Sequence, residues 1–217
     1  MKVSHEKLLP VAVCGNLLCW GGDLLLSFFP GKEMVSGLAI SSVWANAPLW
    51  RFSLSGILGG IAMMAVLCGF YAVYNLLKPQ TPKAAAAFMI GGLLSCIPGA
   101  VFHMQCTSTA WIYDKLGGTK EAAEIAMDFF TQYLPLMILC TVGIILSCVI
   151  LVICVICRKT PLPRWAAVFN IVAIMTVLSC LKPLVTIPGT MNLSGAGMFL
   201  GIWLCLRKKD KTDEPAR

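Results

Sequence analysis

Asp23 is the residue with the clearest chemical potential in this chain, because it lies inside a long apolar stretch, CWGGDLLLSFF. An unpaired Asp at mid-membrane costs about 2.5–3.5 kcal/mol even by low estimates, so it needs a partner or a function. Gly15, Cys19 and Asp23 recur every four residues and share one narrow helix face, on which the small residues let a neighbouring helix approach closely. We therefore expect Asp23 to point into a helix bundle rather than towards lipid.

The polar residues expected at the depth of Asp23 come from other apolar stretches. Asp23 precedes Phe29 by six residues, which places it about 9 Å below the outer end of its helix. The residues expected at this depth are Arg51, His103, Lys182 and Asn192. We rank Arg51 first as the partner of Asp23, because a guanidinium can hold a carboxylate with two hydrogen bonds, and Lys182 and His103 next.

Two interpretations of this group stay open. An Asp–Arg pair can lock two helices in register without any ligand. Alternatively, ionisable residues inside a membrane indicate a functional site, here a polar pocket that opens to the outer face. The predicted ligand-binding residues of that pocket are Asp23, Arg51, His103, Lys182 and Asn192.

Metal and thiol chemistry find little support in the residue pattern. A zinc site needs about three ligands, and the chain has only two histidines, His5 and His103. Cys154 and Cys157 have the spacing of a redox motif, but they fall at a predicted cytoplasmic helix end, where thiols stay reduced. We therefore predict no metal and no cofactor.

An integral-membrane enzyme acting on a lipid is an alternative. His103 and Asp23 would be its acid–base groups, and Ser27 or Ser108 could serve geometrically as the nucleophile. Nothing in the sequence favours either serine, and the chain has no GxSxG, P-loop or GxGxxG motif. No catalytic residue is assigned, and the sequence leans against an enzyme.

The composition indicates helices that cross a membrane. The chain has 217 residues, of which 58% are hydrophobic and 12% charged, whereas about a quarter of the residues of a soluble domain are charged. The net charge of +7 comes from basic residues at the ends of apolar stretches, so it does not indicate nucleic-acid binding. Nearly all of the 11 cysteines lie within apolar stretches, where they are expected to pack rather than to form disulfides.

We predict an all-α polytopic bundle of six transmembrane helices that form one domain over residues 1–206, followed by a basic tail over 207–217. About 20 apolar residues cross a bilayer, so the sixth span is marginal. The predicted spans cover about residues 8–29, 52–77, 84–106, 133–157, 165–187 and 191–206. Of the 17 lysines and arginines, twelve would lie on one side and five on the other, which places both termini in the cytoplasm.

One segment outside the predicted spans has a pattern of its own. In TKEAAEIAMDFFTQY, the acids Glu121, Glu124 and Asp128 fall on one helical face. Thr119 is the expected N-cap, and Glu121 lies near the positive end of the helix dipole. The segment is predicted to form an amphipathic outer helix that leads into the fourth span.

The chain also resembles an uncharacterised family of bacterial multi-pass membrane proteins. The resemblance is carried by Gly21-Gly22-Asp23 in the first span and Trp50-Arg51 at the start of the second, with Pro163-Arg164-Trp165 and Asn192 further on. It implies a location in a bacterial inner membrane and a role for Asp23 and Arg51, but it implies no activity. The function we expect is binding or moving a lipid or small amphiphile, and the alternatives are the lipid enzyme and an assembly partner of another membrane protein. The sequence does not define an oligomeric state.

Overall fold

The protein is built from helices throughout the part that the computed structural model describes, residues 5–29, 40–180 and 188–213. This confirms the all-α prediction. The α-helices are α1 (His5–Ser27), α2 (Leu49–Leu77), α3 (Pro82–Lys115), α4 (Lys120–Thr131), α5 (Leu134–Ile156), α6 (Ile171–Cys180) and α7 (Thr190–Asp213). Two short 3-10 turns, η1 (Ser42–Trp44) and η2 (Arg164–Val168), lie in the connections.

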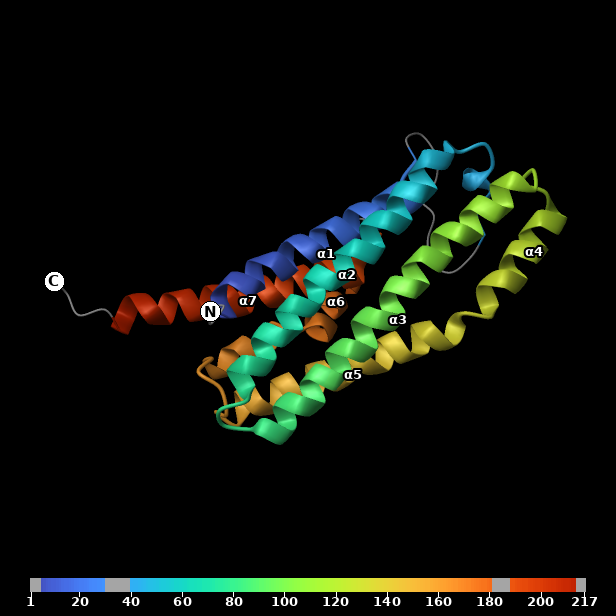
Figure 1. The fold of residues 1–217 in the computed structure, drawn as a ribbon. Coiled ribbons are helices and arrows are strands. Elements are labelled where there is room, and N and C mark those ends of the chain that lie inside the picture. Colours follow the sequence, from blue (N-terminus) through green and yellow to red (C-terminus); the bar gives the residue numbers. More distant parts are fainter. Residues whose placement is uncertain (1–4, 30–39, 181–187, 214–217) are drawn as a thin grey trace.

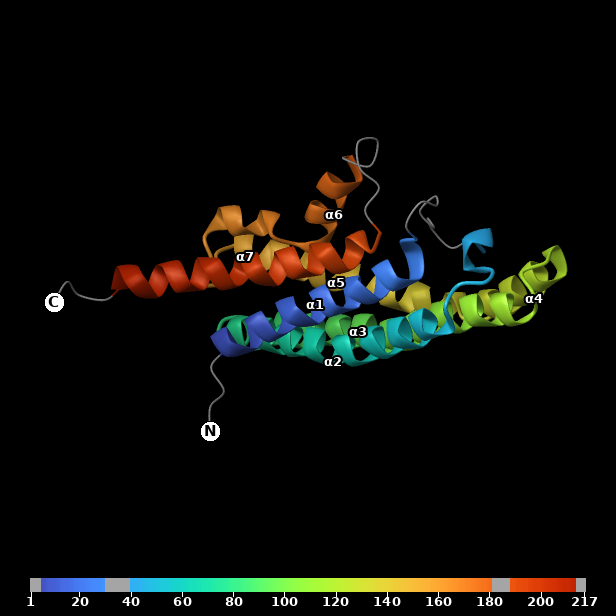
Figure 2. The same cartoon turned by 90° about the horizontal axis from the view of Figure 1, so that it is seen from above.

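The long helices pack as an elongated antiparallel bundle. Helix α1 packs on α2, α2 on α3 and α3 on α5, while α7 returns along α1 (Figure 1). Seen from above, α2 and α3 form one side of the bundle and α6 lies at the opposite side, with α7 between them (Figure 2). Helix α1 begins and helix α7 ends at the same end of the bundle, and α4 lies at the other end (Figure 1).

Four of the described helices, α1, α2, α3 and α5, are long and apolar enough to cross a membrane. They correspond to the first four predicted spans, and they support a membrane-embedded, multi-pass protein. Helix α3 is longer than its predicted span, because it runs on to Lys115 at the α4 end of the bundle. Of the remaining described helices, α6 is apolar but has only 10 residues.

The predicted fifth span, residues 165–187, is not one continuous helix over its described part. The turn η2 ends at Val168 and α6 begins at Ile171. Between them, the Asn170 side chain donates to Ala167 O at 2.8 Å and accepts from Ala173 N at 2.9 Å. Asn170 thus caps α6 locally, because a short amide competes well for nearby backbone groups. Residues 181–187 lie outside the described part.

Helix α7 is longer than the predicted sixth span. It begins at Thr190, after the Pro188-Gly189 turn, and continues to Asp213 through most of the segment predicted to be a tail. Residues 207–213 contain neither Gly nor Pro, and Arg and Lys are good helix formers, so nothing in the sequence stops the helix before Pro215.

The amphipathic helix predicted for this segment is confirmed as α4, Lys120–Thr131. The Thr119 hydroxyl accepts from Ala122 N at 3.2 Å, which is the expected N-cap. Ala122 and Ala126 are buried against α3. Glu124 and Lys120 are both exposed, and their charged groups lie 4.0 Å apart. The acidic face of this helix is therefore a solvated surface.

Two apolar clusters occupy the two halves of the bundle. The first surrounds Phe70, whose ring lies 5.6 Å from that of Phe88 on α3 and 5.5 Å from that of Phe199 on α7. The second surrounds Phe52 of α2 and Tyr113 of α3, near α4. On each of α1, α2 and α3, the residues between the two clusters include buried or half-buried polar groups, and these form the site described next.

Candidate functional site

The Asp23 side chain points into the bundle and meets two other helices. Its Oδ1 atom lies 3.6 Å from Nδ1 of His103 on α3, and its Oδ2 atom accepts a hydrogen bond from Nδ2 of Asn192 on α7 at 2.7 Å. The Asp23 side chain is 19% exposed and that of His103 only 10%. The carboxylate therefore has two polar partners and retains a narrow opening.

His103 is seated against the backbones of α1 and α2. Its Nε2 atom lies 3.2 Å from the carbonyl oxygen of Ser55, which only an N–H can satisfy, so Nε2 carries hydrogen and Nδ1 faces Asp23. A Cβ at Gly59 would overlap the imidazole, and one at Gly22 would lie 3.1 Å from Nε2. The Ser55 hydroxyl donates to Gly22 O at 2.7 Å and thereby links α2 to α1 beside the imidazole. Any larger side chain at Gly59 would displace the ring.

The start of α7 closes the site on its third side. Gly189 has φ +62°, and a Cβ on it would overlap the Asp23 carboxylate. Trp20 Nε1 donates to Pro188 O at 2.9 Å and fastens this turn to α1. Asp23 thus lies at the N-terminal end of α7, where the helix dipole favours a negative charge.

Arg51 is not the partner of Asp23, so the first-ranked prediction was wrong. Its Nε atom donates to Leu25 O at 3.0 Å, its Nη2 atom donates to Phe28 O, and its guanidinium lies 4.2 Å from the centre of the Phe29 ring. Leu25 lies in the last turn of α1 and Phe28 directly follows the helix, where no further helical N–H pairs with the carbonyls. Because the antiparallel α2 begins beside that turn, the Arg51 side chain contacts the end of α1 and does not contact the Asp23 carboxylate.

The other predicted residues divide into two groups. His103 and Asn192 are brought together at Asp23. Lys182 lies outside the described residues. Within the described ranges, Asp23 has no ion pair with a lysine or arginine, and the one basic side chain that meets it is an imidazole.

Sequence reasoning missed the residues that seat His103. The glycine that faces the imidazole is Gly59. The signal that could have revealed it is a histidine and a glycine at matching depth on consecutive antiparallel helices. Cys19 is one of the cysteines expected only to pack against apolar neighbours, but its Sγ atom lies 3.9 Å from His103 Nδ1.

The arrangement does not have the geometry of a catalytic triad. In a triad, the acid and the nucleophile bind opposite ring nitrogens of the histidine. Here Asp23 and Cys19 both face Nδ1, while Nε2 is occupied by the Ser55 carbonyl. Ser108, a proposed nucleophile, instead donates to Met104 O at 3.0 Å. Among the described residues, no group of three His, Cys, Asp or Glu side chains is placed to hold a metal ion.

The fold and this site define the class of the protein as a helical, multi-pass membrane protein with an acid–histidine pair inside the bundle. The chain belongs to a family of unknown function, DUF6796, whose sequence profile matches residues 1–208. This agrees with the expected uncharacterised family. No curated protein and no solved structure matches the chain.

Proposed function

We propose that this protein binds a lipid or small amphiphile, and moves it, through the polar site around Asp23. The observation that carries the proposal is the Asp23 carboxylate, which lies between three helices and keeps 19% of its side chain exposed. Among the described residues, its ion-pair and hydrogen-bond partners are an imidazole and an amide. A carboxylate in this setting is costly, and such residues mark ligand or ion pathways in membrane proteins.

The surroundings of the site suit a ligand with a polar head and an apolar tail. Met191, next to Asn192, is 39% exposed, and Phe28, which directly follows the helix that carries Asp23, is 49% exposed. Apolar side chains thus flank a polar centre. Trp20, at the same turn, has an amphipathic ring of the kind that membrane proteins place near head groups.

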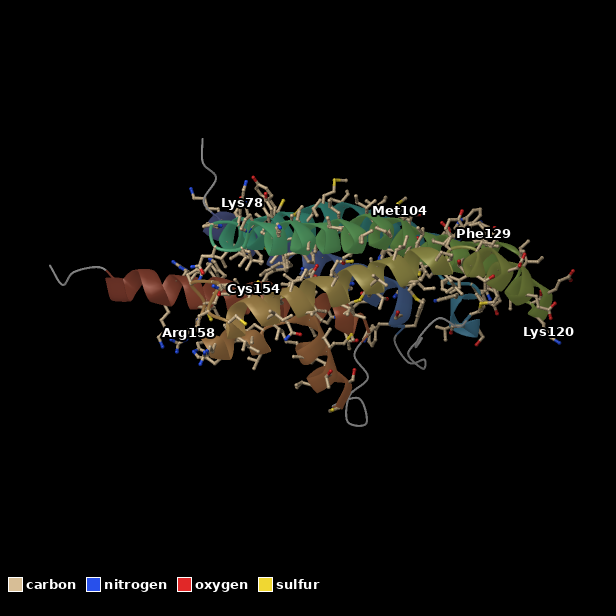
Figure 3. All side chains as sticks on the ribbon, turned by 90° about the horizontal axis from the view of Figure 1, so that it is seen from below. Lys78, Met104, Lys120, Phe129, Cys154 and Arg158 are labelled. Carbon is tan, nitrogen blue, oxygen red and sulfur yellow. The ribbon has the colours of Figure 1, made fainter. Side chains whose placement is uncertain are left out.

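In this proposal the site opens to the outer leaflet of a bacterial inner membrane, and both termini are cytoplasmic. Lys78 and Arg158 lie at one end of the bundle and Lys120 at the other (Figure 3). The first end also carries the start of α1 and the basic end of α7. The positive-inside rule assigns this lysine- and arginine-rich end to the cytoplasm.

The two alternatives differ in how they use the same contacts. An enzyme acting through His103 requires a ring nitrogen that reaches the substrate, and both nitrogens already face protein groups. A purely structural site has a specific observation in its favour, since Asp23 and Trp20 both fasten the start of α7 to α1. The experiment therefore has to separate ligand binding from helix fastening.

The test compares Asp23→Asn with the wild type and with Asp128→Asn, the same substitution at an exposed position of α4. Native mass spectrometry from nonionic detergent measures co-purified lipid, and thermal unfolding measures stability. We expect Asp23→Asn to lose bound lipid while Asp128→Asn retains it. Equal lipid binding in all three proteins, with a lower melting temperature for Asp23→Asn alone, would leave only the structural role.

A further inference from the structure

Among the residues that the structure describes, the charges around Asp23 do not balance without an added positive charge. With a neutral imidazole, the group formed by Asp23, His103 and Asn192 carries one negative charge. The nearest arginine in the chain order, Arg51, is committed to the carbonyls of Leu25 and Phe28. One proton on the acid–histidine pair would make the group neutral.

The groups that face Asp23 come from each element packed around it. Helix α3 contributes His103, whose Nδ1 atom lies 3.6 Å from Oδ1 of Asp23. The thiol groups nearby are those of Cys19 on α1, with Sγ 3.9 Å from His103 Nδ1, and of Cys106 on α3. Helix α7 contributes the neutral amide of Asn192, and α2 contributes the Ser55 carbonyl behind the imidazole. Within the described ranges, the acid and the imidazole are thus the pair between which a proton can be shared.

We propose that the site takes cationic ligands, specifically the ammonium head of an amphiphile, and that each bound cation displaces one proton from the Asp23–His103 pair. This inference rests on the proposed function and names its substrate class. A carboxylate, an amide oxygen and backbone carbonyls offer acceptors to an ammonium group. An anionic head could not use these acceptors, and it would be repelled by the carboxylate whenever the carboxylate is ionised.

The exchange is balanced in atoms and charge. In the empty state the pair holds one titratable proton, bound to Oδ of Asp23 or Nδ1 of His103. An ammonium group beside the carboxylate disfavours that second positive charge. The O–H or N–H bond breaks, the proton passes to water at the exposed edge of Asp23, and the ammonium takes its place. The net charge of the buried group is zero before and after.

The test measures binding and proton release in the same solution. Purified full-length protein in nonionic detergent and weak buffer is titrated with decylammonium, decyl sulfate or decanol, and a pH-sensitive dye reports released protons. We expect wild type to bind decylammonium at least tenfold more tightly than decanol and to release about one proton per bound cation. Asp128→Asn should behave like wild type, and Asp23→Asn should lose both signals.

Measurements on the wild-type protein alone can overturn the inference, so the test remains valid even if the Asp23→Asn variant folds poorly. Decylammonium binding without proton release would overturn the exchange. Preferential binding of decanol or decyl sulfate that requires Asp23 would overturn the cationic class and leave the proposed function intact, whereas binding of none of the three probes would count against the proposed function itself. Lys182→Met is measured alongside, because proton release that appears only in this variant would show that a lysine balances the site in wild type and would overturn the proposal.

Discussion

Nδ1 of His103 lies 3.6 Å from Oδ1 of Asp23, so α1 and α3 meet through an acid–histidine pair between the two apolar clusters of the bundle. The pair is not held by its own attraction alone. The backbone at Gly22 and Gly59 fits the imidazole, and the turn at Gly189 fits the carboxylate. Each of the helices α1, α2, α3 and α7 therefore has a backbone or side-chain group that positions the pair.

The close packing of His103 against α2 predicts that alanine substitutions at two adjacent glycines differ strongly in their effect on stability. Gly59→Ala places a methyl group into the imidazole, and we expect it to lower the free energy of unfolding by about 1–3 kcal/mol through overpacking. Gly60→Ala places the same group 3.5 Å from Met104 Sδ, an ordinary contact, so its effect should stay within about 1 kcal/mol. Thermal and denaturant unfolding in detergent measure both. Equal effects of the two substitutions would contradict the close packing of the imidazole against Gly59.

Arg51→Ala tests the helix-end role that the structure gives this residue. The substitution removes a charged donor from Leu25 O and Phe28 O, and we expect a loss of stability of about 1–3 kcal/mol. Hydrogen exchange should rise in the last turn of α1. Lys120→Ala is the control, because its side chain is 94% exposed and its ion pair with Glu124 is worth little.

The same substitution separates the helix end from the site. Arg51→Ala should leave proton release by decylammonium unchanged once the protein is folded, because Arg51 does not contact Asp23. A loss of that signal as large as the loss in Asp23→Asn would show that Arg51 belongs to the site after all.

The contrast between Arg51 and His103 shows which features of the site can be predicted from the sequence and which cannot. An acid inside an apolar helix can be recognised in a single sequence, because its energetic cost demands a partner. The long apolar runs 8–29, 52–77, 84–106 and 133–157 likewise predict the four helices that are long and apolar enough to cross a membrane. The choice of partner is not readable. It depends on helix rotation: α1 turns its Asp23 face towards α3 and α7, while the start of α2 lies against the end of α1.

Local hydrogen bonding explains the helix boundary that the hydropathy pattern missed. The stretch 165–187 is uniformly apolar apart from a few residues, so a sliding pattern predicts one span. One side chain, Asn170, satisfies the backbone at both Ala167 and Ala173 and makes a break there inexpensive. Such a break follows from a competition between two hydrogen-bond patterns, which hydrophobicity does not encode.

The proposed orientation predicts which ends of the bundle face the cell exterior. A cysteine introduced by Lys120→Cys at the start of α4 should react with a membrane-impermeant maleimide on intact cells. One introduced by Gln80→Cys, in the turn between α2 and α3, should react only after permeabilisation. The wild-type chain, with its 11 native cysteines, supplies the background. The opposite labelling pattern would place the termini outside.

A double-mutant cycle tests whether Asp23 and His103 act as a pair. The substitutions Asp23→Asn and His103→Gln remove one partner each, and contact partners of this kind have coupling energies of about 0.5–3 kcal/mol in unfolding. The control cycle combines His103→Gln with Asp114→Asn, an acid on the same helix whose carboxylate accepts from Asn46 N at 2.7 Å. That acid lies about 16 Å along the axis from His103 at 1.5 Å per residue, so the control effects should add within about 0.3–0.5 kcal/mol. Additive effects in the Asp23 cycle would mean that the two side chains are neighbours without energetic coupling, and the pair would then have no basis as a shared proton site.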